Sequence, residues 1–266
     1  MIDQSIDNKN KIIVIKIGGS TLGLGDSTIP DIISIKKSGY SPVIIHGGGK
    51  EINEWIKKLG IMPEFVNALR KTNKITLDIA IAVFTGLVNS QLVAEFNNLN
   101  QNVIGLSGLD GSILRATIKS PDLGYVGEIV ETNTSFIKRI VDLGLIPIIS
   151  PAAININSEN TDDQILNINA DTAAGHIAKS LNANMLIFQT DVPGVMDVRK
   201  RVIPHMTTLQ AKELIDTGIA IGGMIPKIQA CILASKKIKS GYIIDGRIKG
   251  ALTDCISGKK IGTKIT

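Results

Sequence analysis

Residues 12–20 read Ile-Ile-Val-Ile-Lys-Ile-Gly-Gly-Ser, an apolar run that carries one lysine and ends at paired glycines. The run has the length and the β-branched composition of a buried strand. Because Gly18 and Gly19 put no side chain in front of their backbone N–H groups, an anion can approach these groups closely. Lys16 brings a positive charge to the same place. The stretch therefore predicts a strand that ends in an anion-binding loop.

A second copy of this arrangement follows about thirty residues later, where Pro42 to Ile45 predicts a buried strand that ends in His46-Gly47-Gly48-Gly49. Glycine-rich turns follow strands in many α/β folds for reasons of turn geometry alone, so either loop taken singly has a purely structural explanation. Two glycine loops after two strands favour a site that holds two anionic groups together.

Composition narrows the class of protein. The 266 residues are 44% hydrophobic, which is enough for a substantial core and excludes a disordered chain. Aromatic residues make up only 3%, so the core is aliphatic, which suits parallel strands covered by helices and argues against base-stacking platforms. The net charge is +5, but the lysines are scattered over helical stretches as on a solvated face. We expect no nucleic-acid partner.

Cysteines and histidines show no metal-binding or disulfide pattern. Cys231 and Cys255 stand far apart, and His46, His176 and His205 lack metal-ligand spacing. We therefore expect neither a disulfide framework nor a protein-bound metal site. No uncharged apolar stretch reaches the roughly 18 residues that a membrane span needs. We expect a soluble, cytoplasmic protein without a membrane partner.

Apolar runs of strand length alternate with longer segments of helical period, a pattern typical of crossover units in a mainly parallel sheet. We expect strands near residues 12–17, 42–45, 103–106, 145–149, 185–189 and 242–244. We expect helices near residues 51–59, 76–97, 135–143, 172–181, 209–217 and 227–237. Between Ile113 and Val130 the β-branched residues are broken by Pro121 and Gly124, which predicts a hairpin. The fold class is therefore α/β.

One polar stretch, residues 155–163, predicts an exposed loop that could separate two closely packed lobes of a single domain spanning residues 1–266. We expect one lobe over about residues 1–160 and the other over about residues 161–266. Active sites in open α/β sheets gather at the carboxyl ends of strands. A cleft between such lobes would receive both glycine loops.

Polar and apolar residues alternate from Ile165 to Asp171, which in extended chain puts Asn167, Asn169 and Asp171 on one face. Asp171 also precedes a helical segment, so an ordinary helix cap is an alternative explanation for it. Capping explains the aspartate but neither asparagine. The alternation therefore favours three polar groups that face one site.

Two further stretches suggest contacts with an anion. Residues 190–194 read Thr-Asp-Val-Pro-Gly after a predicted strand, where a tight turn could hold a nucleotide, although a plain β-turn explains them nearly as well. Pro226 suits the first turn of a helix and Lys227 follows it. A lysine at a helix N-terminus opposes the helix dipole, which makes sense beside an anion. A solvated surface lysine is the alternative.

Several ordered motifs together resemble the acetylglutamate kinase family of the amino acid kinase superfamily, over residues 13–265. They are Lys16-Ile17-Gly18-Gly19, His46-Gly47-Gly48-Gly49, Glu64-Phe65-Val66-Asn67 with Arg70, Gly105-Leu106-Ser107-Gly108 with Asp110-Gly111, Asn167-Ile168-Asn169-Ala170-Asp171, Thr190-Asp191-Val192-Pro193-Gly194, Gly222-Gly223-Met224-Ile225-Pro226-Lys227 and Ile244-Asp245-Gly246-Arg247. The resemblance implies an open three-layer αβα sandwich with a mainly parallel central sheet, as in carbamate kinase-like folds. It also implies that the first lobe binds the amino acid and forms a dimer, while the second binds ATP.

The reaction that the resemblance implies is phosphorylation of the γ-carboxylate of N-acetyl-L-glutamate by ATP with Mg²⁺, the second step of arginine synthesis. It implies catalytic roles for Lys16, Lys227 and Asp171, with the aspartate orienting the two lysines. The implied contacts of the acetylamino acid are Gly48, Gly49, Arg70 and Asn167. The implied contacts of ATP are Gly18, Gly19, Asp191, Val192, Pro193, Gly194, Val195, Met196, Ile219, Ala220 and Ile221.

About eleven residues precede the first predicted strand, whereas arginine-inhibited hexameric members of the family carry an additional N-terminal helix. We therefore expect a homodimer. Two other functions stay open at this point. A kinase of carrier-linked aminoadipate or glutamate, in lysine or ornithine synthesis, would suit the basic pI of about 9.1. A nucleotide-sensing subunit without catalysis usually lacks a catalytic lysine, and here Lys16 and Lys227 are both present.

Overall fold

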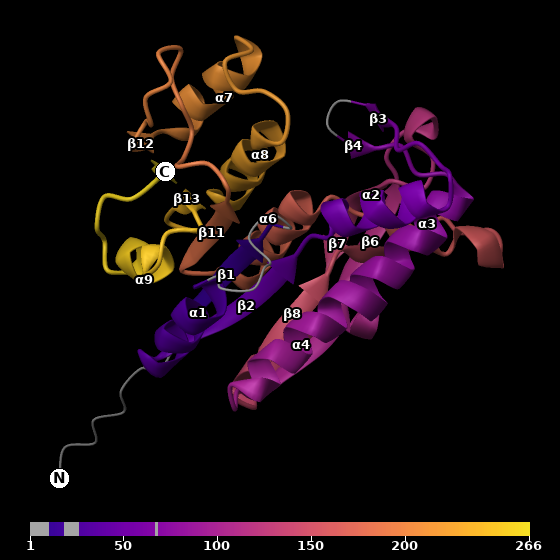
Figure 1. The fold of residues 1–266 in the computed structure, drawn as a ribbon, viewed down its shortest axis with the longest axis horizontal. Coiled ribbons are helices and arrows are strands. Elements are labelled where there is room, and N and C mark those ends of the chain that lie inside the picture. The colour runs from indigo at the N-terminus through magenta and orange to yellow at the C-terminus, as the bar shows by residue number, and fades with distance from the viewer. Residues whose placement is uncertain (1–10, 19–26, 67–68) are drawn as a thin grey trace.

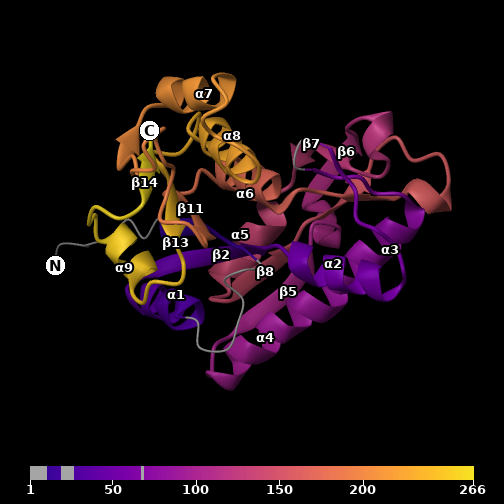
Figure 2. The same ribbon diagram turned by 45° about the horizontal axis from the view of Figure 1, so that its top comes forward.

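The computed structural model describes residues 11–18, 27–66 and 69–266 (Figures 1 and 2). Its strands are β1 Lys11–Ile17, β2 Tyr40–His46, β3 Phe65–Val66, β4 Leu69–Arg70, β5 Val103–Ser107, β6 Leu114–Ile118, β7 Gly127–Thr132, β8 Ile146–Ser150, β9 Ala152–Asn155, β10 Ile165–Asn167, β11 Met185–Thr190, β12 His205–Met206, β13 Gly241–Asp245 and β14 Thr263–Ile265. Its α-helices are α1 Thr28–Lys37, α2 Gly49–Lys58, α3 Lys74–Ile81, α4 Asn89–Asn98, α5 Ser135–Asp142, α6 Ala170–Leu181, α7 Thr208–Asp216, α8 Met224–Ala234 and α9 Ala251–Ile256.

Eight strands form the central sheet in the order β12-β14-β13-β11-β1-β2-β8-β5. From β13 to β5 every neighbouring pair is parallel, while β14 runs antiparallel to β13. A four-stranded sheet, β10-β9-β6-β7, and the β3-β4 hairpin complete the described strands. Because β1 and β2 lie side by side and parallel, the segments that follow both strands leave the same edge of the sheet.

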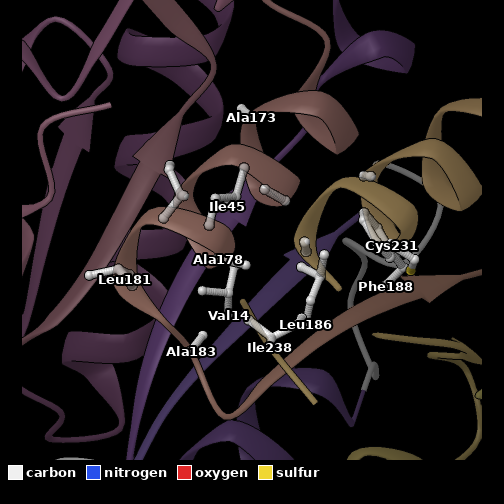
Figure 3. Packing of buried hydrophobic residues seen from close by; sticks show 14 of the residues in the cluster. Val14, Ile45, Ala173, Ala178, Leu181, Ala183, Leu186, Phe188, Cys231 and Ile238 are labelled. Carbon is white, nitrogen blue, oxygen red and sulfur yellow. The ribbon is translucent and has the colours of Figure 1, made fainter. Parts of the chain in front are cut away.

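Helices cover both faces of the central sheet, and each face has its own apolar core. One core joins α5, α6 and α8 to strand residues such as Val14, Ile45 and Phe188 (Figure 3). The other joins α1, α2, α4 and α9 to Ile13, Ile15 and their neighbours. Each strand thus places alternate side chains in opposite layers. The predicted three-layer αβα sandwich with a mainly parallel sheet is confirmed.

The predicted helix over residues 76–97 is present as α3 and α4, joined by a π-helical turn, Ala82–Val88. The continuous stretch Lys74–Asn98 is long and apolar enough to cross a membrane, and 39% of its most apolar window is buried. Leu77, Phe84, Leu92 and Phe96 of this stretch are buried in the protein core. Length and composition are therefore weak grounds for a membrane span, because core helices pass the same test.

Several short elements and helix α1 differ from the sequence expectations. The predicted hairpin is present as β6 and β7, which pair antiparallel. The helix α9 and the short strands β3, β4, β9, β12 and β14 were not predicted, because few residues carry each pattern. The ten-residue helix α1 was also not predicted, and its buried face includes the polar residues Thr28 and Asp31. The polar stretch 155–163 joins β9 to β10, which pair with each other. This loop therefore lies within one small sheet, and the division into two lobes stays a prediction.

Candidate active site

Two predicted anion-binding segments meet at the carboxyl ends of β1 and β2. Gly47 N–H donates a hydrogen bond to the carbonyl of Ile17, with 3.1 Å between nitrogen and oxygen. A Cβ built on Gly47 would lie 3.9 Å from Lys16 Nζ, so the lysine ammonium group borders the glycine loop. Helix α2 begins at Gly49, and the N–H groups of a first helical turn lack acceptors within their helix. Gly18 directly follows β1, and Gly19 lies outside the described residues.

The alternating stretch 165–171 forms a strand end followed by a capped helix. Strand β10 ends at Asn167, whose Nδ2 donates to Thr72 Oγ1 at 3.1 Å. Asn169 is the N-cap of α6, because its Oδ1 accepts hydrogen bonds from the backbone nitrogens of Asp171 and Thr172, both at 3.0 Å. The capping residue is thus Asn169, and the Asp171 side chain is available for other contacts.

Close packing of α6 against α8 sets the distance between Asp171 and Lys227. A Cβ on Gly175 would lie 2.8 Å from the Cβ of Ala230, closer than side chains can pack, so only glycine allows this approach. Gly175 lies about one helical turn after Asp171, and Ala230 about one turn after Lys227. The contact between the two helices therefore places their first turns side by side.

Asp171 is held between two ammonium groups. Its Oδ1 lies 2.9 Å from Lys16 Nζ, and its Oδ2 lies 2.9 Å from Lys227 Nζ. The lysine of α8 also donates to the carbonyl of Gly223 at 3.1 Å. Burial alone would raise the pKa of Asp171, but the charges of the two lysines outweigh it and hold this pKa below its ordinary value. The carboxylate therefore stays ionised and serves as a fixed bridge between two cations.

Arg70, at the end of β4, points a partly unpaired guanidinium toward the glycine loop. Its Nη2 donates to the carbonyl of Gly49 at 3.2 Å, and its Cζ lies 4.9 Å from the ring centroid of Phe65. Nη1 is buried, and no acceptor for it exists among the described residues. Burial lowers the pKa of Arg70. A half-buried cation with a free donor is ready to bind an anion.

These side chains line one pocket of about 230 Å³. Its polar lining includes Lys16, Gly47, Gly48, Gly49, Arg70, Asn167, Asn169 and Asp171. A second cavity, of about 580 Å³, shares Leu69, Val126 and Asn169 with it and reaches Gly222. Lys227 joins the group through Asp171. Two lysines thus pair with one carboxylate and Arg70 lies in the same pocket, an excess of positive charge that suits two anionic ligands.

Apart from the glycines after β1, the residues predicted to contact ATP line neither cavity; those of residues 191–196 directly follow β11, and those of residues 219–221 lie between α7 and α8. They are Asp191, Val192, Pro193, Gly194, Val195, Met196, Ile219, Ala220 and Ile221. Val195 is buried in the core, and its N–H donates to Thr263 Oγ1 at 2.8 Å. Ala220 is also buried, whereas Asp191 and Ile221 are exposed. The structure therefore brings Lys16, Arg70, Asn167, Asp171 and Lys227 together but does not bring these turns into the pocket.

Sequence reasoning assigned no role to Phe84 and Asn89. Phe84 lines the pocket from the π-helical turn, and Asn89 Nδ2 lies 3.0 Å from His46 Nε2. The available signal was an asparagine on the apolar face of a long helix, between Val88 and Leu92. Within the described ranges no group of three or more His, Cys, Asp or Glu residues could hold a metal ion. The expectation of no protein-bound metal stays a prediction.

Comparison with known proteins gives a consistent result. Residues 11–245 match the model of the amino acid kinase family. An acetylglutamate kinase of Dehalococcoides mccartyi is 38% identical over 96% of this chain and 94% of its own length. One of Caldanaerobacter subterraneus is 42% identical over 96% of this chain and 87% of its own length. A crystal structure of a Streptococcus mutans protein, 29% identical, superposes with a TM-score of 0.82 and covers 96% of this chain and 98% of that one.

Proposed function

We propose that this protein transfers the γ-phosphoryl group of ATP to N-acetyl-L-glutamate. The chain belongs to the amino acid kinase family, and its relatives named acetylglutamate kinase match nearly its whole length. The product is N-acetyl-L-glutamyl 5-phosphate, an intermediate of arginine synthesis. The alternatives of a carrier-linked acceptor and of a sensing subunit are not favoured, since no relative reported above carries such a name. The kinase activity and ATP as co-substrate follow from the family, and the acceptor follows from the names of these relatives.

One observation carries the chemistry: Asp171 holds Lys16 and Lys227 at 2.9 Å each beside the glycine loop. Phosphoryl transfer leaves a protein little covalent work beyond positioning and neutralising charge. A γ-carboxylate oxygen of the acceptor attacks the γ-phosphorus while the bond to the ADP oxygen breaks. The acceptor has no proton to lose, so no general base is needed. Both oxygens of Asp171 are occupied by ammonium groups, which fits an orienting role.

We assign the two lysines to opposite sides of the transferring phosphoryl group. Lys16 stands on the side of the glycine loop and would neutralise charge where the acceptor meets the phosphoryl group. Lys227 would do so on the side of the leaving ADP. Backbone N–H groups of Gly18, Gly48 and Gly49 would add uncharged hydrogen-bond donors to the phosphoryl oxygens. Because each carboxylate oxygen of Asp171 binds one ammonium group, the two lysines stay at separate positions, one for each side of the phosphoryl group.

We assign the acetylamino acid to the pocket of about 230 Å³. The unpaired Nη1 of Arg70 supports a bidentate contact with the α-carboxylate. Asn167 also lines this pocket and supplies an amide group that Thr72 orients. The turns at residues 191–196 and 219–221 are assigned to the adenosine part of ATP. Mg²⁺ would arrive bound to the ATP phosphates, since it keeps oxygen ligands from phosphate and water.

The proposal also covers organisation and location. We propose a homodimer whose subunits each consist of two lobes, an amino-acid lobe over about residues 1–160 and a nucleotide lobe over about residues 161–266. We propose a cytoplasmic enzyme without nucleic-acid or membrane partners. The apolar face of Lys74–Asn98, buried in the core, supports the last point. Light scattering of the purified protein would test the dimer.

The experiment that tests the function is ADP release by the purified protein with ATP and Mg²⁺. The acceptors, each tested separately, are N-acetylglutamate, glutamate, aspartate, acetylaminoadipate and UMP. We expect strong release with N-acetylglutamate alone. Glutamate is the matched control, since it has the same carbon skeleton but carries a charged ammonium group in place of the neutral acetamide. No release with any free acceptor, from a folded protein that still binds ATP, would contradict the proposal.

A further inference from the structure

A buried polar pair lies beneath the glycine loop of residues 47–49. His46 is the last residue of β2 and is 0% exposed. Asn89 is the first residue of α4, directly after the π-helical turn, and is 5% exposed. Neither residue lines the pocket, and the reaction proposed above uses neither. Burying a polar side chain in an aliphatic layer destabilises the folded protein unless the side chain is hydrogen-bonded, so the contacts of these two residues matter for stability.

Acceptors around Asn89 fix the orientation of its amide group. Nδ2 lies 2.9 Å from the carbonyl oxygen of Ile148, 3.2 Å from that of Leu106 and 3.0 Å from His46 Nε2. Two of these three neighbours are carbonyl oxygens, which only accept hydrogen bonds, so the NH₂ end of the amide must face them. The amide nitrogen only donates hydrogen bonds, so its 3.0 Å contact with His46 is favourable only when Nε2 of the imidazole is unprotonated and accepts.

The orientation of Asn89 determines where the imidazole proton lies. With Nε2 accepting, the ring carries its proton on Nδ1, which lies 2.8 Å from the carbonyl oxygen of Gly47. Burial lowers the pKa of His46 to about 4; the bond to Gly47 opposes this shift, and the charge of Lys16 adds to it. The neutral ring therefore donates to Gly47, while the N–H of Gly47 donates to Ile17.

The long helix touches the glycine loop at a second point. A Cβ on Gly48 would lie 3.0 Å from Cδ1 of Phe84, which is carried by the π-helical turn. A Cβ on Gly105 would lie 2.1 Å from Asn89 Oδ1, so only glycine on β5 leaves room for this amide. π-Helical turns often occur at functional sites. Here the turn places Phe84 against the loop and Asn89 beneath it.

We propose that Asn89 and His46 are positioning residues that hold the glycine loop of residues 47–49 in the geometry that receives the carboxylate-bearing acceptor. The contacts run from Asn89 Nδ2 through the imidazole to the carbonyl of Gly47. Neither side chain touches the substrate. The inference rests on the proposed function, because that function assigns Gly48 and Gly49 to the acceptor. It adds a specific tautomer of His46 and a role for the π-helical turn.

The first test reads the tautomer of His46 without any assay of activity. The whole protein, labelled with ¹⁵N in histidine and free of substrates, is examined by long-range ¹H–¹⁵N NMR at pH 7. His46→Gln identifies the signals among the three histidines. We expect a protonated Nδ1 and an unprotonated Nε2. A proton on Nε2, or a charged imidazolium, would overturn the proposal. This test determines the tautomer of His46 even if the protein releases no ADP with any acceptor, so it stays independent of the proposed function.

The second test separates positioning from general stability. Asn89→Ala should raise the KM for N-acetylglutamate about tenfold, the size of one lost hydrogen bond, and leave the KM for ATP within about twofold. Asn97→Ala is the matched control, since Asn97 lies exposed on the same helix. An unchanged acceptor KM, or an equal rise for both substrates, would overturn the proposal.

A pair of conservative variants covers the case in which Asn89→Ala fails to fold. His46→Asn can place an amide nitrogen near the position of Nδ1 and keep the bond to Gly47. His46→Gln reaches instead toward the position of Nε2. We expect His46→Asn to stay nearer to the wild-type acceptor KM than His46→Gln. The opposite order would overturn the proposal, because it would show that the bond to Gly47 does not matter.

Discussion

The two sides of the candidate site are built in different ways. The acceptor side consists of the residues that line the pocket of about 230 Å³. Three of its polar residues, Lys16, Asn167 and Asp171, are each less than a tenth exposed and are held by side-chain hydrogen bonds or ion pairs. On the proposed nucleotide side, residues 191–196 and 219–221, Asp191 is exposed and Ile221 is 72% exposed, while Val195 and Ala220 are buried apolar residues. Buried and paired polar side chains thus hold the acceptor side in place, whereas the backbone of the turns defines the proposed nucleotide side.

This difference suggests how the enzyme divides recognition between its substrates. A small dicarboxylate has few groups that a protein can bind, so its recognition depends on a few strong contacts. These contacts must be preorganised before the substrate binds. ATP is larger and can gather many weak contacts along an open edge. Single substitutions should therefore have large effects in the acceptor pocket and small effects along the nucleotide side. The predictions below test this contrast.

The largest effect is expected for Lys16→Ala, which removes one cation beside the transferring phosphoryl group. One charge at about 4 Å and an effective dielectric constant of about 20 is worth at most about 4 kcal/mol, so kcat should fall by roughly two to three orders of magnitude. Lys11→Ala, on an exposed lysine of the same strand, is the control and should keep wild-type turnover. Wild-type kcat in purified Lys16→Ala would remove this lysine from the chemistry.

His46 should make the free energy of unfolding of the protein depend on pH. Its pKa is lowered from 6.5 to about 4 in the folded protein, so the unfolded chain binds the proton first as pH falls. The free energy of unfolding should therefore decrease from about pH 6.5 toward pH 4, by on the order of 3 kcal/mol at most. Urea unfolding at several pH values measures this slope.

Two histidine variants isolate this effect. The slope should flatten in His46→Gln. Burial also lowers the pKa of His176, which is only half-buried, so His176→Gln should remove a smaller part of the slope. If His46→Gln keeps the whole wild-type slope, the buried imidazole does not resist protonation as described.

Arg70→Ala should weaken the acceptor alone. Losing a charge-assisted pair with the α-carboxylate costs about 2 kcal/mol, which would raise the KM for N-acetylglutamate roughly thirtyfold. The KM for ATP should stay within about twofold. Arg70→Lys should lie between the two, because an ammonium group keeps the charge but loses the two parallel hydrogen bonds. Equal losses for both substrates would place Arg70 outside the acceptor site.

The smallest effect is expected for Asp191→Asn on the nucleotide side. Exposed charged contacts contribute up to about 1 kcal/mol, so the KM for ATP should change by less than about fivefold. Initial rates at saturating N-acetylglutamate measure it. A change well above tenfold would erase the contrast between the two sides, since the nucleotide edge would then be as tightly specified as the acceptor pocket.

How much the sequence could predict depends on whether the signal is local. The apolar runs before Gly18 and before Gly47 carry their strand signal within a few residues, so both strands and the glycine loop of residues 47–49 were predictable. The helix cap was not: the sequence suggested capping for Asp171 and not for the asparagines, whereas the observed hydrogen bonds make Asn169 the cap, and both residue types cap helices well. Local chemistry thus located the site but not every role within it.

Long-range packing accounts for what the sequence could not predict. Asn89 and His46 are 43 residues apart, and their contact depends on a π-helical turn that leaves no clear sequence pattern. The contact between Asp171 and Lys227 requires α6 and α8 to meet at Gly175, which reads in sequence as an unfavourable helix residue. Motif spacing suggested which residues matter. Only the packed helices show why they meet.

The most direct test of the central claim identifies the bond that forms. Purified protein is incubated with ATP, Mg²⁺ and N-acetylglutamate in the presence of hydroxylamine, which converts an acyl phosphate into a stable hydroxamate. The account predicts one hydroxamate of acetylglutamate for each ADP released, and none with glutamate in its place. ADP without hydroxamate, or equal yields from the two acceptors, would contradict phosphoryl transfer to the γ-carboxylate of N-acetylglutamate.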